Sequence, residues 1–386
     1  MTRPTVVHVI TRLENGGAQR HAIHILKHLP KDRYRVVLAY GPGGYLDDEA
    51  RNLKDVELWP IEALQRSIGP KSDLKALWQI RSKLKSIQDG PIIVQTHSSK
   101  AGVLGRLGAS LRGVTARIHT VHGFGFHAGN SKVSQSVLKM VEKRSARLSD
   151  WNLCVSKHDL RLGVRHGLLR EDNSSIIHAG VDLDHHARDP KKGAKLRQDL
   201  NIPKDAPVIS TIACLKPQKA PLDFVRFARR VYELNPETHF IYVGDGDMRK
   251  DFLNEVHSQS GLSSNFHFMG WTDRIVDVLS ASNIFALLSL WEGLPRAIIE
   301  ARAAGLPCLV TRICGNPEAV TDGVHGFLLP PGRPASAAEQ AVKLIRMPEL
   351  LDTLSSNATD GLDPFHIKHV VPKHVELYER FINPQA

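Results

Sequence analysis

Short runs of consecutive apolar residues alternate along the chain with longer stretches in which apolar residues recur every three or four positions. Short runs are typical of strands buried on both faces of a sheet, and the longer stretches are typical of amphipathic helices. In the first half, this pattern predicts strands at 6–10, 34–39, 92–96, 117–121 and 151–155, separated by helices such as 18–28 and 75–86. In the second half, it predicts strands at 208–213, 239–243, 265–268, 284–288 and 308–311, with helices such as 222–234 and 335–346.

Alternating strands and helices predict parallel sheets with helices on both faces. Two such series in 386 residues predict the α/β class, with two doubly wound, Rossmann-like domains that bind ligands at the carboxyl ends of their strands. Polar, proline-containing segments between 185 and 206 predict the boundary, giving an N-terminal domain at 1–185 and a C-terminal domain at 186–365. Residues 366–386 are expected to form a helical tail that packs back toward the N-terminal domain, kinked or broken at Pro372.

The composition, with 42% hydrophobic and 24% charged residues, is that of a globular protein with a sizeable core. No apolar run approaches the ~20 residues needed to cross a bilayer, and the first apolar stretch is too short for a secretory signal. The four cysteines (Cys154, Cys214, Cys308 and Cys314) lack the spacing of metal ligands. We therefore expect reduced thiols in a cytoplasmic protein.

The net charge of +11 lies entirely in the first half of the chain. Residues 1–185 carry 28 Lys and Arg against 17 Asp and Glu, whereas the remainder carries 23 of each. Such an excess suits nucleic acid, an anionic membrane or a phosphorylated substrate. Nucleic acid is the weakest of the three, because no nucleic-acid-binding motif is present and only 6% of residues are aromatic. The charge asymmetry therefore favours a membrane or an anionic acceptor.

Two glutamates, Glu292 and Glu300, flank the start of a predicted helix that follows the strand at 284–288. Pro295 fits the first turn of this helix, where a missing N–H group costs little, and Gly305 is part of the signal that ends it. A helix N-terminus stabilises phosphate, and a carboxylate one turn further in can accept hydrogen bonds from two ribose hydroxyls. The spacing alone also fits an ordinary amphipathic helix, so the neighbouring motifs decide in favour of a nucleotide-sugar site.

Further motifs occur in a fixed order at 209–220, 239–247, 268–271, 311–318 and 322–330. This order resembles the donor-binding C-terminal domain of retaining glycosyltransferases with the GT-B fold, specifically glycosyltransferase family 4. In the first half, 14–20 is similar to that family's glycine-rich loop, and 96–102 and 119–127 are similar to its acceptor-domain loops. The resemblance covers nearly the whole chain and implies two domains that face each other across a cleft.

The resemblance implies roles for the matched residues. Lys219 would bind the donor phosphates, Glu292 would lie near the transferred sugar, and His122 would donate a hydrogen bond to that sugar. His127 is a weaker candidate. The full donor-binding set is Gly16, Gly17, Lys216, Lys219, Gly244, Gly293, Leu294, Pro295, Glu300 and Glu318.

The two glycines and Lys216 have structural alternatives or substitutions to consider. Gly16 and Gly17 would let the backbone approach the leaving diphosphate, although a strand-to-helix turn would need glycine as well. Cys214 stands where the family often has arginine, and Lys216 could supply the missing cation.

The segment Asp245-Gly246-Asp247 spells D-x-D, a metal-binding signature of the other major glycosyltransferase fold. Here it continues a Val-Gly-Asp-Gly turn after a parallel strand, so we interpret it as a loop near the nucleotide base. We expect no metal and no cofactor. The spacing of Gly102, Gly105 and Gly108 indicates a closely packed helix face rather than a phosphate loop.

The resemblance implies transfer of a sugar from a nucleotide-sugar to a hydroxyl of a glycan acceptor with retention of configuration. UDP is the expected nucleotide, and GDP is the alternative. The basic first half and its His-Gly-Phe-Gly-Phe-His loop are similar to bacterial enzymes of polysaccharide biosynthesis that extend undecaprenyl-diphosphate-linked saccharides. We therefore expect peripheral contact with an anionic membrane at its cytoplasmic face. A nucleotide-sugar 2-epimerase, a sugar-phosphate synthase and a non-catalytic nucleotide-sugar-binding module remain alternatives, and Cys214 favours the last.

Overall fold

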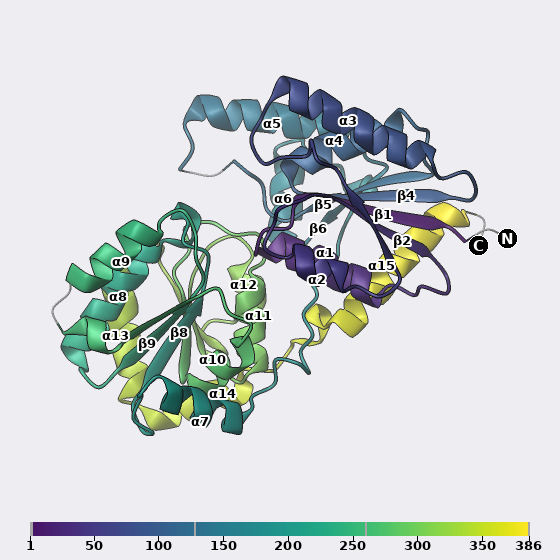
Figure 1. The fold of residues 1–386 in the computed structure, drawn as a ribbon. Helices are drawn as coiled ribbons and strands as arrows, with labels where there is room; N and C mark the ends of the chain where they lie inside the picture. Colours follow the sequence, from purple (N-terminus) through teal and green to yellow (C-terminus); the bar gives the residue numbers. More distant parts are fainter. Residues whose placement is uncertain (1–2, 127–128, 259–260, 385–386) are drawn as a thin grey trace. The chain divides into compact units, whose positions relative to one another are not determined.

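The computed structural model describes residues 3–126, 129–258 and 261–384. The chain forms two compact α/β units: an N-terminal unit of residues 1–180 and 367–386, and a C-terminal unit of residues 181–366 (Figure 1). Each unit is a parallel sheet covered by helices, which confirms the predicted fold class. The chain enters the C-terminal unit at Val181, slightly before the predicted boundary, and its last helix belongs to the N-terminal unit.

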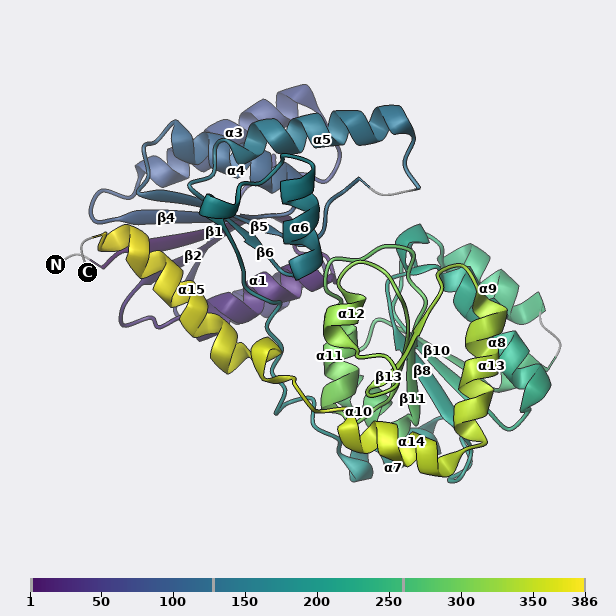
Figure 2. The same cartoon turned by 180° about the vertical axis from the view of Figure 1, so that it is seen from behind.

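The N-terminal sheet has seven parallel strands in the order β3-β2-β1-β4-β5-β6-β7. Their bounds are β1 (Thr5–Arg12), β2 (Arg35–Gly41), β3 (Val56–Pro60), β4 (Ile92–His97), β5 (Ala116–Val121), β6 (Trp151–Cys154) and β7 (Ser174–Ile176). The helices are α1 (Gly17–His28), α2 (Asp47–Arg51), α3 (Pro70–Lys85), α4 (Ser99–Ser110), α5 (Lys132–Ala146), α6 (Lys157–Arg165), the short η1 (Glu171–Asn173) and α15 (Ile367–Ile382). One face of the sheet packs on α1 and α15, and the other packs on α3 and α4 (Figure 2).

The C-terminal sheet has six parallel strands in the order β10-β9-β8-β11-β12-β13. Their bounds are β8 (Val208–Ile212), β9 (His239–Val243), β10 (Phe266–Gly270), β11 (Ile284–Leu287), β12 (Cys308–Thr311) and β13 (Gly326–Leu329). The helices are α7 (Pro190–Asp199), η2 (Pro217–Lys219), α8 (Pro221–Leu234), α9 (Arg249–Ser258), η3 (Leu262–Ser264), α10 (Ile275–Ala281), α11 (Arg296–Ala303), α12 (Asn316–Ala319), α13 (Pro334–Ile345), α14 (Pro348–Asn357) and η4 (Asp363–Phe365).

Of the two effects predicted for Pro372, a kink or a break, the break is absent, because α15 continues on both sides of the proline. Proline removes one intrahelical hydrogen bond, which favours a kink or a break. The buried face of α15, which includes Val370, Leu377 and Tyr378, packs into the N-terminal core on either side of the proline. This packing holds the helix together, so the predicted break is absent.

Each sheet reverses its strand order at one point, which lies between β1 and β4 in the N-terminal unit and between β8 and β11 in the C-terminal unit. Open α/β sheets bind ligands at such a switch point, beside the carboxyl ends of the strands. The candidate residues are therefore best judged by their positions at these two edges. Among the described helices, none combines the length and the hydropathy needed to span a bilayer.

Candidate active site

The loops that follow β8 and β11 are joined at the switch point of the C-terminal unit. The backbone N–H of Leu290 donates to the carbonyl of Gln218 at 2.8 Å, and Gln218 Nε2 donates to the carbonyl of Trp291 at 3.0 Å. These bonds bring Lys219 and Glu292 into an ion pair whose side chains are only 17% and 5% exposed. The cation predicted to bind phosphate and the carboxylate predicted to face the sugar are therefore direct partners in the free protein.

The helix α11 begins beside this ion pair. Pro295 is its N-cap, one position before the first-turn place predicted for it, and its carbonyl accepts from the Ile298 N–H at 3.2 Å. The carbonyl of Gly293 accepts from the Gly315 N–H at 3.0 Å, and Leu294 is buried. The first N–H groups of a helix have no acceptor within it, so this end can bind an anion.

One turn into α11, Glu300 is almost fully buried beside two basic side chains that the sequence did not single out. Arg296 Nη2 lies 3.4 Å from Glu300 Oε1, and His186 Nε2 lies 3.9 Å from the same oxygen. Burial lowers the pKa of His186, so the imidazole is neutral at pH 7 and the charge comes from Arg296. The four-residue spacing could have revealed Arg296, because such residues are neighbours on a helix. His186 lies too far along the chain for any such signal.

The other predicted donor-binding residues of this unit surround the same loops. Gly244 ends the β9 edge at φ +134°, and a Cβ there would lie 2.0 Å from the Ala213 carbonyl oxygen, so the backbone itself requires glycine. Lys216 is half-buried, with no ion pair of its side chain among the residues described. Glu318 lies in α12. The N-cap residue of this helix, Gly315, donates its N–H to the carbonyl of Gly293 in the loop of Glu292. Whether these residues touch a donor stays a prediction.

The D-x-D segment forms internal contacts. Asp245 pairs with Arg249 on α9 and accepts a hydrogen bond from the Gly246 N–H at 2.8 Å, while Asp247 is exposed. Across the described part of the chain, no group of three or more His, Cys, Asp or Glu side chains is arranged to hold a metal ion. The Asp245 carboxylate is thus oriented by an arginine of its own unit.

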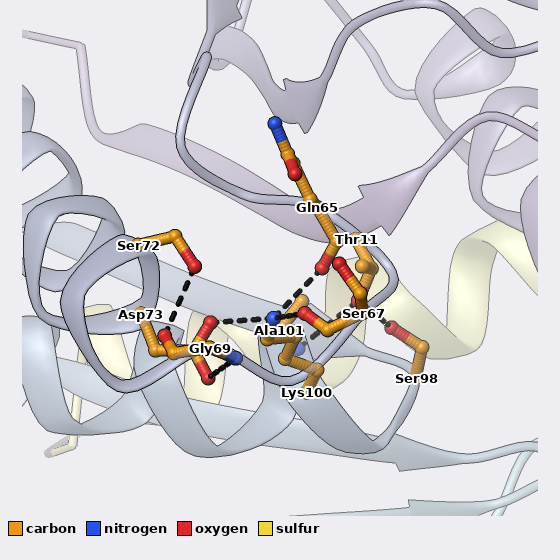
Figure 3. Close-up of polar contacts among 9 residues, drawn as sticks. All are labelled: Thr11, Gln65, Ser67, Gly69, Ser72, Asp73, Ser98, Lys100 and Ala101. Atoms are coloured by element: carbon orange, nitrogen blue, oxygen red, sulfur yellow. Dashed lines mark hydrogen bonds and ion pairs between the residues drawn. The ribbon is translucent and has the colours of Figure 1, made fainter.

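At the switch point of the N-terminal unit, the predicted acceptor-domain loop is tied to two neighbours (Figure 3). Thr11 Oγ1 lies 2.8 Å from Ser98 Oγ. Lys100 Nζ donates to the carbonyls of Gln65, at 2.9 Å, and Ser67, and pairs with Asp73 at 2.5 Å. Through these contacts, Lys100 holds the loop before α3 in place.

The glycine-rich loop after β1 leads into α1 without a strained backbone. Gly16 is the extended N-cap residue and Gly17 is the first helical residue, and neither has a positive φ. A Cβ at Gly17 would meet nothing within 4 Å, and one at Gly16 would meet only the flexible side chain of Gln19. The expectation that this turn itself needs glycine is therefore wrong. Close approach of a ligand remains the reason that we propose for Gly17.

Replacing Gly17 with alanine is expected to separate folding from donor use. The melting temperature should stay unchanged or rise slightly, because alanine fits this space and glycine is the poorer helix residue. If the diphosphate lies against the backbone here, the added methyl should lower kcat/KM for the donor by up to about 10²-fold, the cost that a misplacement of ~1 Å can have. Steady-state kinetics and calorimetry test this, and unchanged kinetics would remove Gly17 from the donor site.

His122 follows β5 and lies in a cluster of buried polar side chains. Its Nε2 is 3.0 Å from Nδ1 of His97, and burial lowers the pKa of His122 to about 3, so the ring is neutral. His127 lies outside the described residues. His97 and His8 were not predicted as partners of His122. His97 lies two positions after Gln95 in a buried strand, which was a visible signal, whereas His8 lies between the apolar residues Val6 and Ile10 of its face.

Comparison with known proteins agrees with this geometry. Residues 15–185 match the family model described as Glycosyltransferase Family 4, and residues 193–361 match Glycosyl transferases group 1. A UDP-Gal:alpha-D-GlcNAc-diphosphoundecaprenol alpha-1,3-galactosyltransferase of Escherichia coli is 32% identical over 370 residues, which are 94% of this chain and 93% of that protein. An N,N'-diacetylbacillosaminyl-diphospho-undecaprenol alpha-1,3-N-acetylgalactosaminyltransferase of Campylobacter jejuni is 24% identical over 96% of this chain and 98% of its own.

Solved structures show the same fold. The Anabaena protein HepE, determined in complex with UDP and glucose, superposes with a TM-score of 0.83 at 21% identity, covering 97% of this chain and 99% of its own. Identity at this level speaks for the fold alone, whereas the matched family models and the 32% identity span nearly the whole chain. The chain therefore belongs to glycosyltransferase family 4 and has the GT-B fold.

Proposed function

We propose that this glycosyltransferase moves a sugar from a UDP-sugar to a hydroxyl of an undecaprenyl-diphosphate-linked saccharide, with retention of configuration and without a metal ion. The observation that carries the proposal is the Lys219–Glu292 pair at the β8/β11 switch point, beside the N-terminus of α11. Lys219 and the N-terminus of α11 would stabilise the charge that develops on the departing diphosphate. Glu300, one turn further in, would accept the ribose hydroxyls.

The ion pair also supports a same-face route. A retaining mechanism with a covalent intermediate needs a carboxylate nucleophile. Glu292 is held against Lys219, and a carboxylate oxygen engaged by a cation is a poor nucleophile. We therefore propose that a leaving phosphate oxygen accepts the proton of the acceptor hydroxyl while the new glycosidic bond forms on the face that the diphosphate leaves. The contact between Asp245 and Arg249 supports a metal-independent site.

The lipid-linked acceptor is supported by the relatives and by one surface of the N-terminal unit. The names of the E. coli and C. jejuni enzymes specify undecaprenol-linked acceptors. In the N-terminal unit, α3 and α5 both pack on α4, on one side of the sheet. They expose apolar side chains, namely Leu74, Trp78, Val133, Val137, Met140 and Val141, among the exposed basic residues Lys71, Lys75, Lys83, Lys85, Lys132, Lys143 and Arg144.

This α3/α5 face has the composition of an interfacial membrane-binding surface, in which apolar side chains enter the lipid and basic side chains attract anionic headgroups. Val133, Val137, Met140 and Val141 follow the spacing of one helix face, with Val133 75% exposed. We propose that this face holds the enzyme at the cytoplasmic surface of an anionic membrane, where the lipid-linked acceptor resides.

Replacing Val137 and Met140 together with glutamate is expected to weaken binding to phosphatidylglycerol vesicles at low salt by about 10-fold or more, because two apolar contacts become repulsive charges. Turnover of a soluble, short-chain acceptor should not change. The matched control replaces Val324 and Met347, which are similarly exposed apolar residues of the C-terminal unit, with glutamate. Equal loss in both double variants, or no binding by the unaltered protein, would contradict a membrane role for the α3/α5 face.

Nucleotide release tests the function as a whole. The purified protein is incubated with UDP- and GDP-sugars and a lipid-linked acceptor extract, with and without EDTA, beside Glu300→Ala. We expect release of UDP that needs the acceptor, resists EDTA and is lost in Glu300→Ala, and an anomeric NMR signal that shows retention. Conversion of the donor without acceptor would indicate an epimerase, and release that stops with EDTA would indicate a metal site. Nucleotide binding without turnover would indicate a binding module.

A further inference from the structure

A row of polar side chains crosses the centre of the N-terminal sheet on the face that packs on α1 and α15. The parallel register pairs His8 of β1 with Gln95 of β4, and His97 of β4 with Thr120 of β5. Residues in register, or two apart on one strand, point to the same face of a sheet. His122, two residues after Thr120, continues this row toward the carboxyl ends of the strands.

These side chains form one continuous chain of hydrogen bonds. His122 Nε2 lies 3.0 Å from His97 Nδ1, and His97 Nε2 lies 3.0 Å from His8 Nδ1. His8 Nε2 lies 3.1 Å from the hydroxyl of Tyr378, on α15, and that hydroxyl contacts Gln95 Oε1. Gln95 Nε2 completes the chain by donating to Thr120 Oγ1 at 2.8 Å. His8, His97, Gln95, Thr120 and Tyr378 are all almost completely buried.

The amide of Gln95 gives the chain a direction. A carbonyl oxygen only accepts, so the single hydroxyl hydrogen of Tyr378 points to Gln95, and the Tyr378 oxygen accepts from His8 Nε2–H. A neutral imidazole has one donor and one acceptor, so His8 Nδ1 accepts from His97 Nε2–H.

The same reasoning continues to His122. The unprotonated Nδ1 of His97 accepts from His122 Nε2–H. The three rings are neutral, because burial lowers the pKa of His8 and His122 to about 3 and that of His97 well below its ordinary value. The nitrogen of His122 that remains for a ligand is therefore Nδ1, without a proton.

We propose that Gln95 and Tyr378 act through His8 and His97 as positioning residues, fixing His122 as the Nε2–H tautomer so that its Nδ1 accepts a hydrogen bond from a hydroxyl of the transferred sugar. The inference rests on the proposed function in placing His122 against the sugar. It differs from the expectation that His122 donates. Because Nδ1 of His122 accepts a hydrogen bond, it selects a sugar with a hydroxyl group at the facing position. A deoxy or fluoro sugar would leave Nδ1 without a donor, so the enzyme should discriminate against it.

The tautomer can be measured without any turnover. In protein labelled with ¹⁵N-histidine, long-range ¹H–¹⁵N correlation spectra distinguish a protonated ring nitrogen from a bare one, and His122→Gln identifies the signals of His122. We expect Nδ1 of His122 to be bare and Nε2 to be protonated in the unaltered protein. In Tyr378→Phe, which removes the hydroxyl that links Gln95 to His8, we expect the two nitrogens of His122 to show averaged, mixed protonation.

Kinetics give the second measurement. In Tyr378→Phe, only the fraction of His122 with a bare Nδ1 can accept from the sugar, so we expect kcat/KM for the UDP-sugar to fall by about 2-fold, with the acceptor KM unchanged. Tyr34→Phe is the matched control, because the Tyr34 hydroxyl contacts Glu379 on the same helix but lies outside the chain. This variant should leave both the spectrum and the donor kinetics as they are.

The outcomes separate the two proposals. A protonated Nδ1 on His122, or a Tyr378→Phe spectrum identical to that of the unaltered protein, would overturn the positioning role even if sugar transfer is intact. Unchanged donor kinetics in Tyr378→Phe with an altered tautomer would show that His122 does not accept from the sugar. The expected spectra in a protein that turns over no UDP-sugar would instead refute the proposed function.

Discussion

Replacing Lys219 with methionine is expected to lower kcat/KM for sugar transfer by about 10²- to 10³-fold, which is the usual cost of losing one preorganised electrostatic donor. The same change should destabilise the free protein. It leaves the Glu292 carboxylate, 5% exposed, without its cation, and breaking a buried pair costs about 3 kcal/mol. Steady-state kinetics and differential scanning calorimetry measure the two effects.

A double variant separates these effects. In Lys219→Met with Glu292→Gln, no uncompensated charge is buried, so most of the lost stability should return while the activity should not. Lys216→Met controls for a general loss of positive charge in this loop, and we expect it to reduce kcat/KM by less than about 10-fold, since the ion pair with Glu292 belongs to Lys219. Recovery of activity in the double variant would show that Lys219 serves the fold and not the diphosphate.

The strands at the centre of each sheet could be predicted from the sequence, because strands covered on both faces are continuous apolar runs. The pattern missed the three strands β3, β7 and β13. The first two are the edge strands of the N-terminal sheet: β3 has one buried residue, Trp59, and β7 has only three residues. β13 is the edge strand of the C-terminal sheet and begins at Gly326. Edge strands face water on one side, so their composition carries a weaker signal.

The parts of the candidate site that lie within one segment of the sequence could be predicted. The contacts between residues far apart in the sequence could not. Glu292, Pro295 and Glu300 lie within one strand-loop-helix segment, so their order could be read directly. The contact between Lys219 and Glu292 depends on β8 and β11 being neighbours, which follows from the strand order and from no local pattern. The chain from His122 to Tyr378 likewise requires the register of three strands and the packing of the last helix.

Glu300→Ala is expected to lower kcat/KM by about 10²-fold, chiefly through a higher donor KM, because hydrogen bonds to a charged acceptor contribute about 1.5–3 kcal/mol each. A donor that lacks a ribose hydroxyl tests whether Glu300 acts there. The unaltered enzyme should use UDP-sugar much better than the 2′-deoxyuridine or 3′-deoxyuridine analogue, whereas Glu300→Ala should discriminate less against at least one analogue. Glu300→Gln retains one acceptor oxygen beside Arg296. Its kcat/KM for the UDP-sugar should therefore lie between those of the unaltered enzyme and Glu300→Ala.

The analogue comparison also excludes a merely structural cause. Removing the Glu300 carboxylate leaves the buried guanidinium of Arg296 without that neighbour, and a general disturbance of α11 would lower the use of all donors by the same factor. A ribose contact predicts instead that the effects of the variant and of one analogue are not additive, since both remove the same hydrogen bond. Equal discrimination by the unaltered enzyme and by Glu300→Ala against both analogues would show that Glu300 supports the site through Arg296 and does not hold the ribose.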